Sequence, residues 1–241
     1  MALLAASLLL MPALPASAQG PAAAQPLPGQ AVQDRQDYSA AERLLFMGQA
    51  MTRLKAPTTL QYNFRKSGSM EEGFEDKVTL RYFKPAKGAC CSVSGQFLSG
   101  PRKVELPDVE VAEANPVLLY FLEHDVREMK RITKGSPNYY RKRIRLAAYE
   151  SAQVSPVQLS YRGQMIKGQQ IELLPYDKDP ARVRFEKHAR KSYTFLLAEG
   201  VPGGVLGART VMRGEGADAP PLVVEELAID GADLAKTRPA S

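Results

Sequence analysis

Apolar and polar residues alternate along much of this chain, which is the pattern of half-buried β-strands. Leu60, Tyr62 and Phe64 alternate with polar neighbours, and residues 78–82 repeat the period. Short turns that contain glycine, such as 161–164, favour antiparallel neighbours. The same reasoning places further strands at 91–98, 102–106, 139–149, 157–161, 165–174, 193–198, 204–212 and 222–229. The pattern therefore predicts a curved antiparallel meander.

Three other segments follow the helical period instead. Ser39 and Glu42 form a capping box at the start of the first helix, and Pro57 ends it. The second helix is predicted at 116–134 and the third at 180–191. Each begins with a proline, and the residue before that proline is suited to the N-cap. Each helix has one apolar face. We therefore expect a mainly β, α+β fold, in which a curved antiparallel sheet or half-barrel has about three helices packed on or in it.

The first 18 residues have the pattern of a cleavable signal peptide. An apolar run at 2–11 is followed by Pro12, Pro15 and the small residues 16–18, so cleavage is predicted after Ala18. No later stretch contains the roughly 20 apolar residues of a membrane helix. We therefore expect a periplasmic protein whose mature chain has no transmembrane segment.

The rest of the chain divides by composition. Residues 19–37 are rich in Ala, Pro and Gln and contain almost no large apolar residue, which predicts a disordered leader. Residues 38–233 contain the predicted strands and helices and suit a single β-rich domain. The last residues, 234–241, are expected to form a flexible tail.

The chain is basic, with 32 Lys and Arg against 26 Asp and Glu and a formal net charge of +6. In an exported protein this charge favours anionic lipid headgroups, cell-wall polymers or acidic protein surfaces as partners, and no nucleic acid. The alternative is that the charge serves solubility alone.

One basic region is a candidate binding site. Arg141, Arg143 and Arg145 alternate with other residues in a predicted strand, so they are expected on one face, with Tyr139 beside them and Arg131 on the preceding helix. Arginines grouped in this way bind phosphates or carboxylates by paired hydrogen bonds. The alternative is a row of arginines on an outer sheet face, some of them paired with the acidic residues of 105–113.

The two cysteines are adjacent, at Cys90 and Cys91. Side chains of neighbouring residues in a strand point to opposite faces, so a regular strand would keep the thiols apart. A turn near Gly88 would instead allow a disulfide between the two. The alternatives are therefore free or buried thiols, a vicinal disulfide, and an intermolecular bridge or redox role.

The sequence contains no catalytic signature. His124 and His188 are its only histidines, and no GxSxG, HExxH, GxGxxG or P-loop pattern is present. The acidic pairs 71–72 and 225–226 have the pattern of surface charge. We therefore expect no enzymatic activity, no cofactor and no metal site.

Residues 40–90 resemble the start of the periplasmic lipoprotein-carrier proteins. The shared features are the helix, the strand Leu60-x-Tyr62-x-Phe64, the turn Gly68-Ser69, the strand Val78-x-Leu80 and Lys84-Pro85. The resemblance implies an open antiparallel half-barrel closed by helices over an apolar cavity. The chain departs from that family because it has no Trp and because the helix at 116–134 has no counterpart. As a whole it resembles an uncharacterised family of proteobacterial secreted proteins.

These features lead to two hypotheses and a third, weaker one. The first is a non-catalytic periplasmic binding or carrier protein for an apolar or amphiphilic ligand, a lipid or acyl chain, with the arginines near an anionic headgroup. The second is an envelope assembly or interaction factor that binds a protein partner through the basic face. The third is an enzyme that uses carboxylates or the two cysteines.

Overall fold

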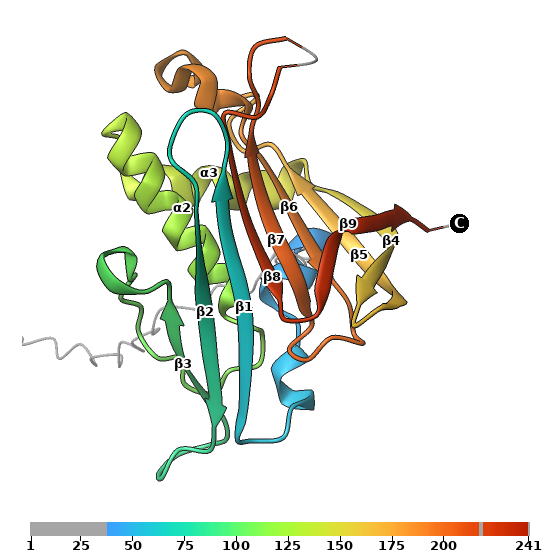
Figure 1. Ribbon diagram of the computed structural model, residues 1–241. Helices are drawn as coiled ribbons and strands as arrows, with labels where there is room; N and C mark the ends of the chain where they lie inside the picture. The colour runs from blue at the N-terminus through green and yellow to red at the C-terminus, as the bar shows by residue number, and fades with distance from the viewer. Residues whose placement is uncertain (1–37, 217–218, 241) are drawn as a thin grey trace, which may run out of the picture. The chain divides into compact units, whose positions relative to one another are not determined.

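The computed structural model describes residues 38–216 and 219–240 and is built on one nine-stranded antiparallel sheet (Figure 1). The strand order is β3-β2-β1-β8-β7-β6-β5-β4-β9. The strands are β1 (Thr58–Ser67), β2 (Phe74–Phe83), β3 (Ser92–Phe97), β4 (Gln153–Tyr161), β5 (Gln164–Leu173), β6 (Ser192–Leu197), β7 (Val205–Met212), β8 (Val223–Ile229) and β9 (Ala232–Pro239). The α-helices are α1 (Ala40–Phe46), α2 (Val117–Thr133) and α3 (Pro137–Glu150), and the 3-10 helices are η1 (Ala50–Arg53), η2 (Gly100–Arg102) and η3 (Arg182–Arg190).

The predicted fold class is confirmed, since the sheet is antiparallel, open and curved and three α-helices accompany it among the described residues. The alternation of apolar residues sets the register. Tyr62 lies opposite Val78 on one side and opposite Ile229 on the other, so apolar side chains meet on the same face in three neighbouring strands. The predicted signal peptide and leader, residues 1–37, lie outside the described part of the chain.

Helices cover one face of the sheet, called here the helix face. The ring of Phe64 from β1 lies 6.5 Å from Phe121 and 5.3 Å from His124, both on α2, and His124 is also 5.4 Å from Phe97 on β3. At the other end of the sheet, Tyr193 of β6 belongs to an aromatic cluster that includes residues of α3. The main core therefore lies between the helices and this face.

The opposite face, called here the open face, is crossed by the last strand. β9 follows β8 after two residues, yet it pairs with β4, which lies four strands away from β8 in the order. Figure 1 shows β9 leaving the end of β8 and running across to β4. Leu234 of β9 packs over Gly207 of β7, where an added Cβ would lie 2.9 Å from the Leu234 side chain. The sheet must therefore curl toward its open face.

Three sequence predictions of local structure are wrong. Residues 139–149 form most of α3, because Ser136 and Pro137 start a helix and the buried positions Tyr140, Ile144 and Ala148 recur every four residues. In 102–106 only Val104 bridges to another strand, because prolines flank the segment at 101 and 107. Residues 234–239, expected in a flexible tail, belong to β9.

Two predicted helices also differ in form. The capping box is confirmed, since Ser39 accepts from the Glu42 N–H and Glu42 accepts from the Ser39 N–H, but the helix ends at Phe46 and a separate 3-10 turn follows before Pro57. The third predicted helix is the 3-10 helix η3.

The close approach of β9 predicts an effect of Gly207→Ala. An added Cβ would meet the Leu227 carbonyl oxygen at 2.6 Å as well as Leu234, so we expect unfolding to become easier by about 1–3 kcal/mol. Urea unfolding followed by circular dichroism measures this. Gly200→Ala is the matched control, because its Cβ would make only an ordinary contact at 3.6 Å. Equal stability of the two variants would contradict the described packing.

Candidate functional site

The arginines expected on one strand face lie instead on α3, so the predicted arrangement is wrong. On a helix, residues two apart are turned by about 200°, so Arg143 faces away from Arg141 and Arg145. Arg143 forms an ion pair with Asp179 at 2.8 Å, and the Tyr139 hydroxyl donates to the same carboxylate at 2.6 Å. Asp179 is fully buried, so this contact fixes the start of α3 to the segment after β5.

The other predicted arginines differ in their partners. Arg141 donates two hydrogen bonds to Glu123, at 2.7 and 3.0 Å. Burial would raise the pKa of Glu123, but Arg141 and Arg127 outweigh it and hold the pKa below its usual value. Arg131 contacts the acidic residues at 71 and 128. Arg145 is exposed and has no ion pair with a described side chain. Several of the cations that the sequence offered for ligand binding are therefore already paired.

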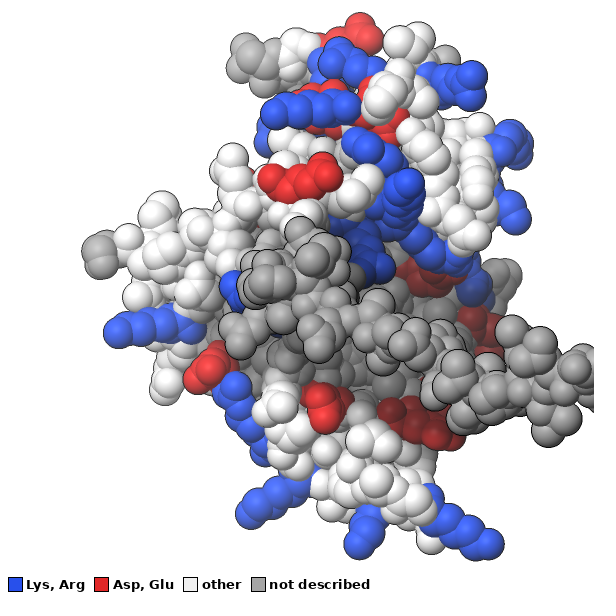
Figure 2. All heavy atoms as spheres, turned by 180° about the vertical axis from the view of Figure 1, so that it is seen from behind, with Lys and Arg blue, Asp and Glu red and all other residues white. Residues whose placement is uncertain are grey.

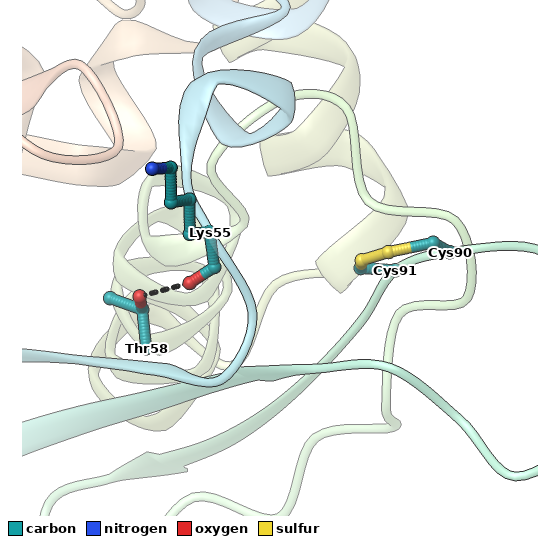
Figure 3. The surroundings of a disulfide bond; sticks show 4 residues. All are labelled: Lys55, Thr58, Cys90 and Cys91. Atoms are coloured by element: carbon teal, nitrogen blue, oxygen red, sulfur yellow. Dashed lines mark hydrogen bonds between the residues drawn. A yellow bond between two sulfur atoms is a disulfide. The ribbon is translucent and has the colours of Figure 1, made fainter.

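The adjacent cysteines are joined in a disulfide (Figure 3). Of the sequence alternatives, the structure contains the vicinal one. Cys90 is exposed while Cys91 is buried, and the Cys91 carbonyl accepts a hydrogen bond from the Ala112 N–H at 2.7 Å. Figure 3 also shows the nearby turn in which the Thr58 hydroxyl donates to the Lys55 carbonyl. A redox role for the pair stays a prediction.

The curl of the sheet leaves a groove of about 1540 Å³ on the open face. Strands β1, β2 and β5 to β8 form its floor, and the end of α3, residues 174–178 and β9 form its sides. Its charged lining consists of the cations Arg65, Lys77, Arg143, Lys178, Arg209 and Arg213 and the acids Glu75, Asp76, Glu150, Glu172, Asp177, Glu226 and Asp233. The groove thus has six cationic and seven acidic side chains and no strong excess of either sign.

Polar and apolar parts of the groove come from different elements. On the floor, Arg65 donates to Glu226 at 2.5 Å, and Arg209 lies 3.4 Å from the same carboxylate. Aliphatic side chains are supplied by α3, the segment after β5, β6 and β9, namely Leu146, Leu174, Leu196 and Leu234. The resemblance had implied an apolar cavity, whereas this groove is amphipathic. Of the predicted binding residues, only Arg143 lines it.

A second cluster of charge is buried on the helix face. Glu225 of β8 is 2 % exposed and lies 3.3 Å from His124, 3.8 Å from Lys66 and 3.8 Å from Lys191. Lys191 also forms an ion pair with the fully buried Asp125, which accepts a hydrogen bond from a tyrosine hydroxyl of β6. These contacts join α2 to three strands. The sequence reading of Glu225 as surface charge is therefore wrong.

The cluster favours the charged forms of Glu225 and Lys191. Burial would raise the pKa of Glu225, but Lys191, His124 and Lys66 lower it to about 2. Burial would likewise lower the pKa of Lys191, and Asp125 and Glu225 raise it instead. Because the cluster is enclosed in the core, we expect it to act on stability.

Among the described residues, no group of three or more His, Cys, Asp or Glu is placed to hold a metal ion. No helix in that part of the chain is both long and apolar enough to cross a bilayer.

The buried cluster predicts a large effect of Glu225→Gln. The substitution leaves two buried lysines without a full complement of negative charge, so we expect a loss of about 3–5 kcal/mol in unfolding free energy. Glu226→Gln is the matched control on the next residue, whose side chain faces the groove and pairs with partly exposed arginines. It should cost less than about 1 kcal/mol. Similar losses in denaturant titrations of both variants would contradict the assignment of the two faces.

The lowered pKa of Glu225 also predicts a pH dependence of stability. The folded-state pKa is about 2 and the ordinary value is 4.5, so the unfolded chain binds the proton first as pH falls. The contribution, on the order of 3 kcal/mol, is present above pH 4.5 and is lost between pH 4.5 and 2. Over that range the stability curve of Glu225→Gln should be flatter than that of the wild type. Parallel curves would contradict this.

Comparison with known proteins gives one structural match to report. No protein-family model matches the chain, and no curated protein matches it in sequence. Among solved structures, the chain is similar to the crystal structure of the Mycobacterium tuberculosis lipoprotein LppX, with a TM-score of 0.32 and 10% identity. The match covers 84% of this chain and 96% of that one.

Proposed function

We propose that this protein is a non-catalytic binding or carrier protein that holds an amphiphilic ligand in the groove of the open face. The observation that carries the proposal is the groove itself, with a volume of about 1540 Å³ and a lining that is partly aliphatic and partly charged. Sites for small molecules are usually about 300–1000 Å³. The larger volume favours an elongated ligand such as a lipid or another molecule with an acyl chain.

The aliphatic part of the groove supplies the affinity in this proposal. Leu146, Leu196 and Leu234 come from separate elements that line one groove, so an acyl chain would contact all of them. Each methylene removed from water contributes about 0.8 kcal/mol. About ten methylenes would therefore contribute roughly 8 kcal/mol before the cost of ordering the ligand is subtracted.

The charged part of the groove orients the polar end. Arg65 and Glu226 satisfy each other, so the floor offers both donors and acceptors rather than a concentrated positive charge. An anionic group would instead find Lys77, Lys178 and Arg213, which line the groove without an ion pair to any described side chain. These three cations replace the α3 arginines as the candidates for a headgroup contact.

Export belongs to the same proposal. The signal-peptide pattern of residues 1–18 supports a periplasmic location, where envelope lipids are the abundant amphiphiles. The alternative of a protein partner bound through Arg141, Arg143 and Arg145 has less support. Arg141 and Arg143 already bind carboxylates, and Arg145 lies on a different side of α3 from Arg143.

Filling the groove tests the proposal. Thr194 lies on β6 in the floor, half-buried, so Thr194→Trp should occupy the groove without entering the core. We expect at least a tenfold loss of affinity for N-phenyl-1-naphthylamine, an uncharged apolar fluorophore, measured by fluorescence titration. Lipid that remains bound to the wild type in native mass spectrometry should be lost from this variant.

Thr79→Trp is the matched control, because Thr79 is also a half-buried strand threonine but does not line the groove. It should bind like the wild type. The proposal fails if the wild type neither carries a lipid nor binds the fluorophore. Equal binding by Thr194→Trp would place the ligand outside the groove.

A further inference from the structure

We propose that the segment Lys178–Arg190 docks the protein onto an anionic lipid bilayer. It begins at Lys178, the last residue of the side of the groove formed by residues 174–178, so a docked protein would present that end of the groove to the membrane. The docking itself stands apart from ligand binding. Only its use for loading or releasing a ligand rests on the proposed function.

The segment is strongly basic and its cations are available. Its exposed cations are Lys178, Arg182, Arg184 and Arg190, Lys187 is half-buried, and none of the five forms an ion pair with a described side chain. The segment contains two acidic residues against these five cations: Asp179, which is fully buried and pairs with Arg143, and Glu186, which precedes Lys187 in the sequence. Asp177 is the exposed acid at the edge of the segment. Arg182 donates a hydrogen bond to the backbone carbonyl of Asp177 at 3.3 Å, which leaves its charge without a carboxylate partner. Cations without a carboxylate partner favour an anionic surface.

An apolar side chain projects from the middle of these cations. Val183 is 84 % exposed and lies between two exposed arginines, and Leu174 at the rim of the groove is 52 % exposed. In water an aliphatic side chain gains nothing from this position. At a bilayer surface the aliphatic group enters the boundary of the acyl chains while the arginines remain with the headgroups. This combination favours a lipid surface over an acidic protein.

The core holds the segment in place. Phe185 is buried, with its ring 5.6 Å from Tyr176 and 5.9 Å from Tyr140. His188 and Lys191 are also buried, and the spacing of three residues is one turn of a 3-10 helix. One side of η3 is therefore anchored, while its exposed cations are outward. Figure 1 shows η3 projecting beyond the end of the sheet, and Figure 2 shows Lys and Arg side chains at that end with Asp and Glu side chains among them.

A tryptophan probe tests the contact directly, because the chain contains no Trp. In Val183→Trp, vesicles of phosphatidylglycerol should shift the emission to shorter wavelength, and brominated lipid should quench it. Vesicles of phosphatidylcholine should do neither. Met165→Trp is the matched control, since Met165 is 46 % exposed at the opposite end of β5 from this segment. Its emission should not change.

The charge requirement is tested by vesicle co-sedimentation. Each cation near an anionic surface contributes about a fivefold gain in binding, so Arg182→Gln with Arg184→Gln should lower the partition coefficient on the order of 25-fold. The control is Lys84→Gln with Lys87→Gln, which removes the same charge from two exposed lysines in the loop after β2. It should lower binding by less than threefold. Circular dichroism confirms that each variant is folded.

Several results would overturn the docking proposal. One is equal binding to the two kinds of vesicle, and another is an equal loss in the two double variants. If Val183→Trp binds soluble polyglutamate while brominated lipid leaves its emission unquenched, an acidic protein partner is favoured instead. The groove-filling Thr194→Trp should lose ligand binding but dock normally. Arg182→Gln with Arg184→Gln should lose docking but keep ligand binding. These opposite results separate the two proposals.

Discussion

The pairing of β9 with β4 is the constraint on which the shape of the open face depends. β9 starts two residues after β8, and it reaches β4 only if the sheet curls over its own open face. Gly207 permits this because its missing side chain makes room for Leu234. The curl creates the groove and gives it aliphatic side chains from β9. Without that pairing, the charged strands of the floor would form an ordinary solvated face.

The alternation of side chains along β8 connects the groove to the core beneath it. Glu225 points to the helix face and is enclosed by lysines and a histidine, while Glu226 points into the groove and is held by two arginines. Two adjacent carboxylates therefore have opposite roles. One fastens α2 to the sheet, and the other fixes the arginines of the groove floor. A shift in register by one residue would exchange the two faces and disrupt both arrangements.

The sequence predicted the sheet well because burial on one face leaves a clear period of two, as in β1 and β8. The prediction failed at residues 139–149, where a helical segment also showed an alternation of residue types and was taken for a strand. In α3 the arginines at 141, 143 and 145 alternate with other residues by chance, while the buried positions follow a spacing of four. The charged floor of the groove could not be predicted from the sequence. Arg65 and Glu226 occupy the polar positions of alternating strands, which is the pattern of residues that face solvent. Only the curl, which depends on the long-range pairing of β9 with β4, turns that face into a groove.

Positive charge is distributed unevenly between the groove and the rest of the surface. The chain has a net charge of +6, yet the groove lining is nearly balanced and several arginines of α2 and α3 bind carboxylates. The excess is instead displayed at surfaces such as η3, where it projects around an exposed valine. Under the proposed function, a ligand in the groove would be selected by shape and by its apolar length. Under the docking proposal, the net charge would act on the protein's encounter with anionic surfaces. The two proposals share Leu174 and Lys178 at the rim of the groove but otherwise depend on different residues, so Thr194 on the floor and Arg182 and Arg184 on η3 can be changed separately.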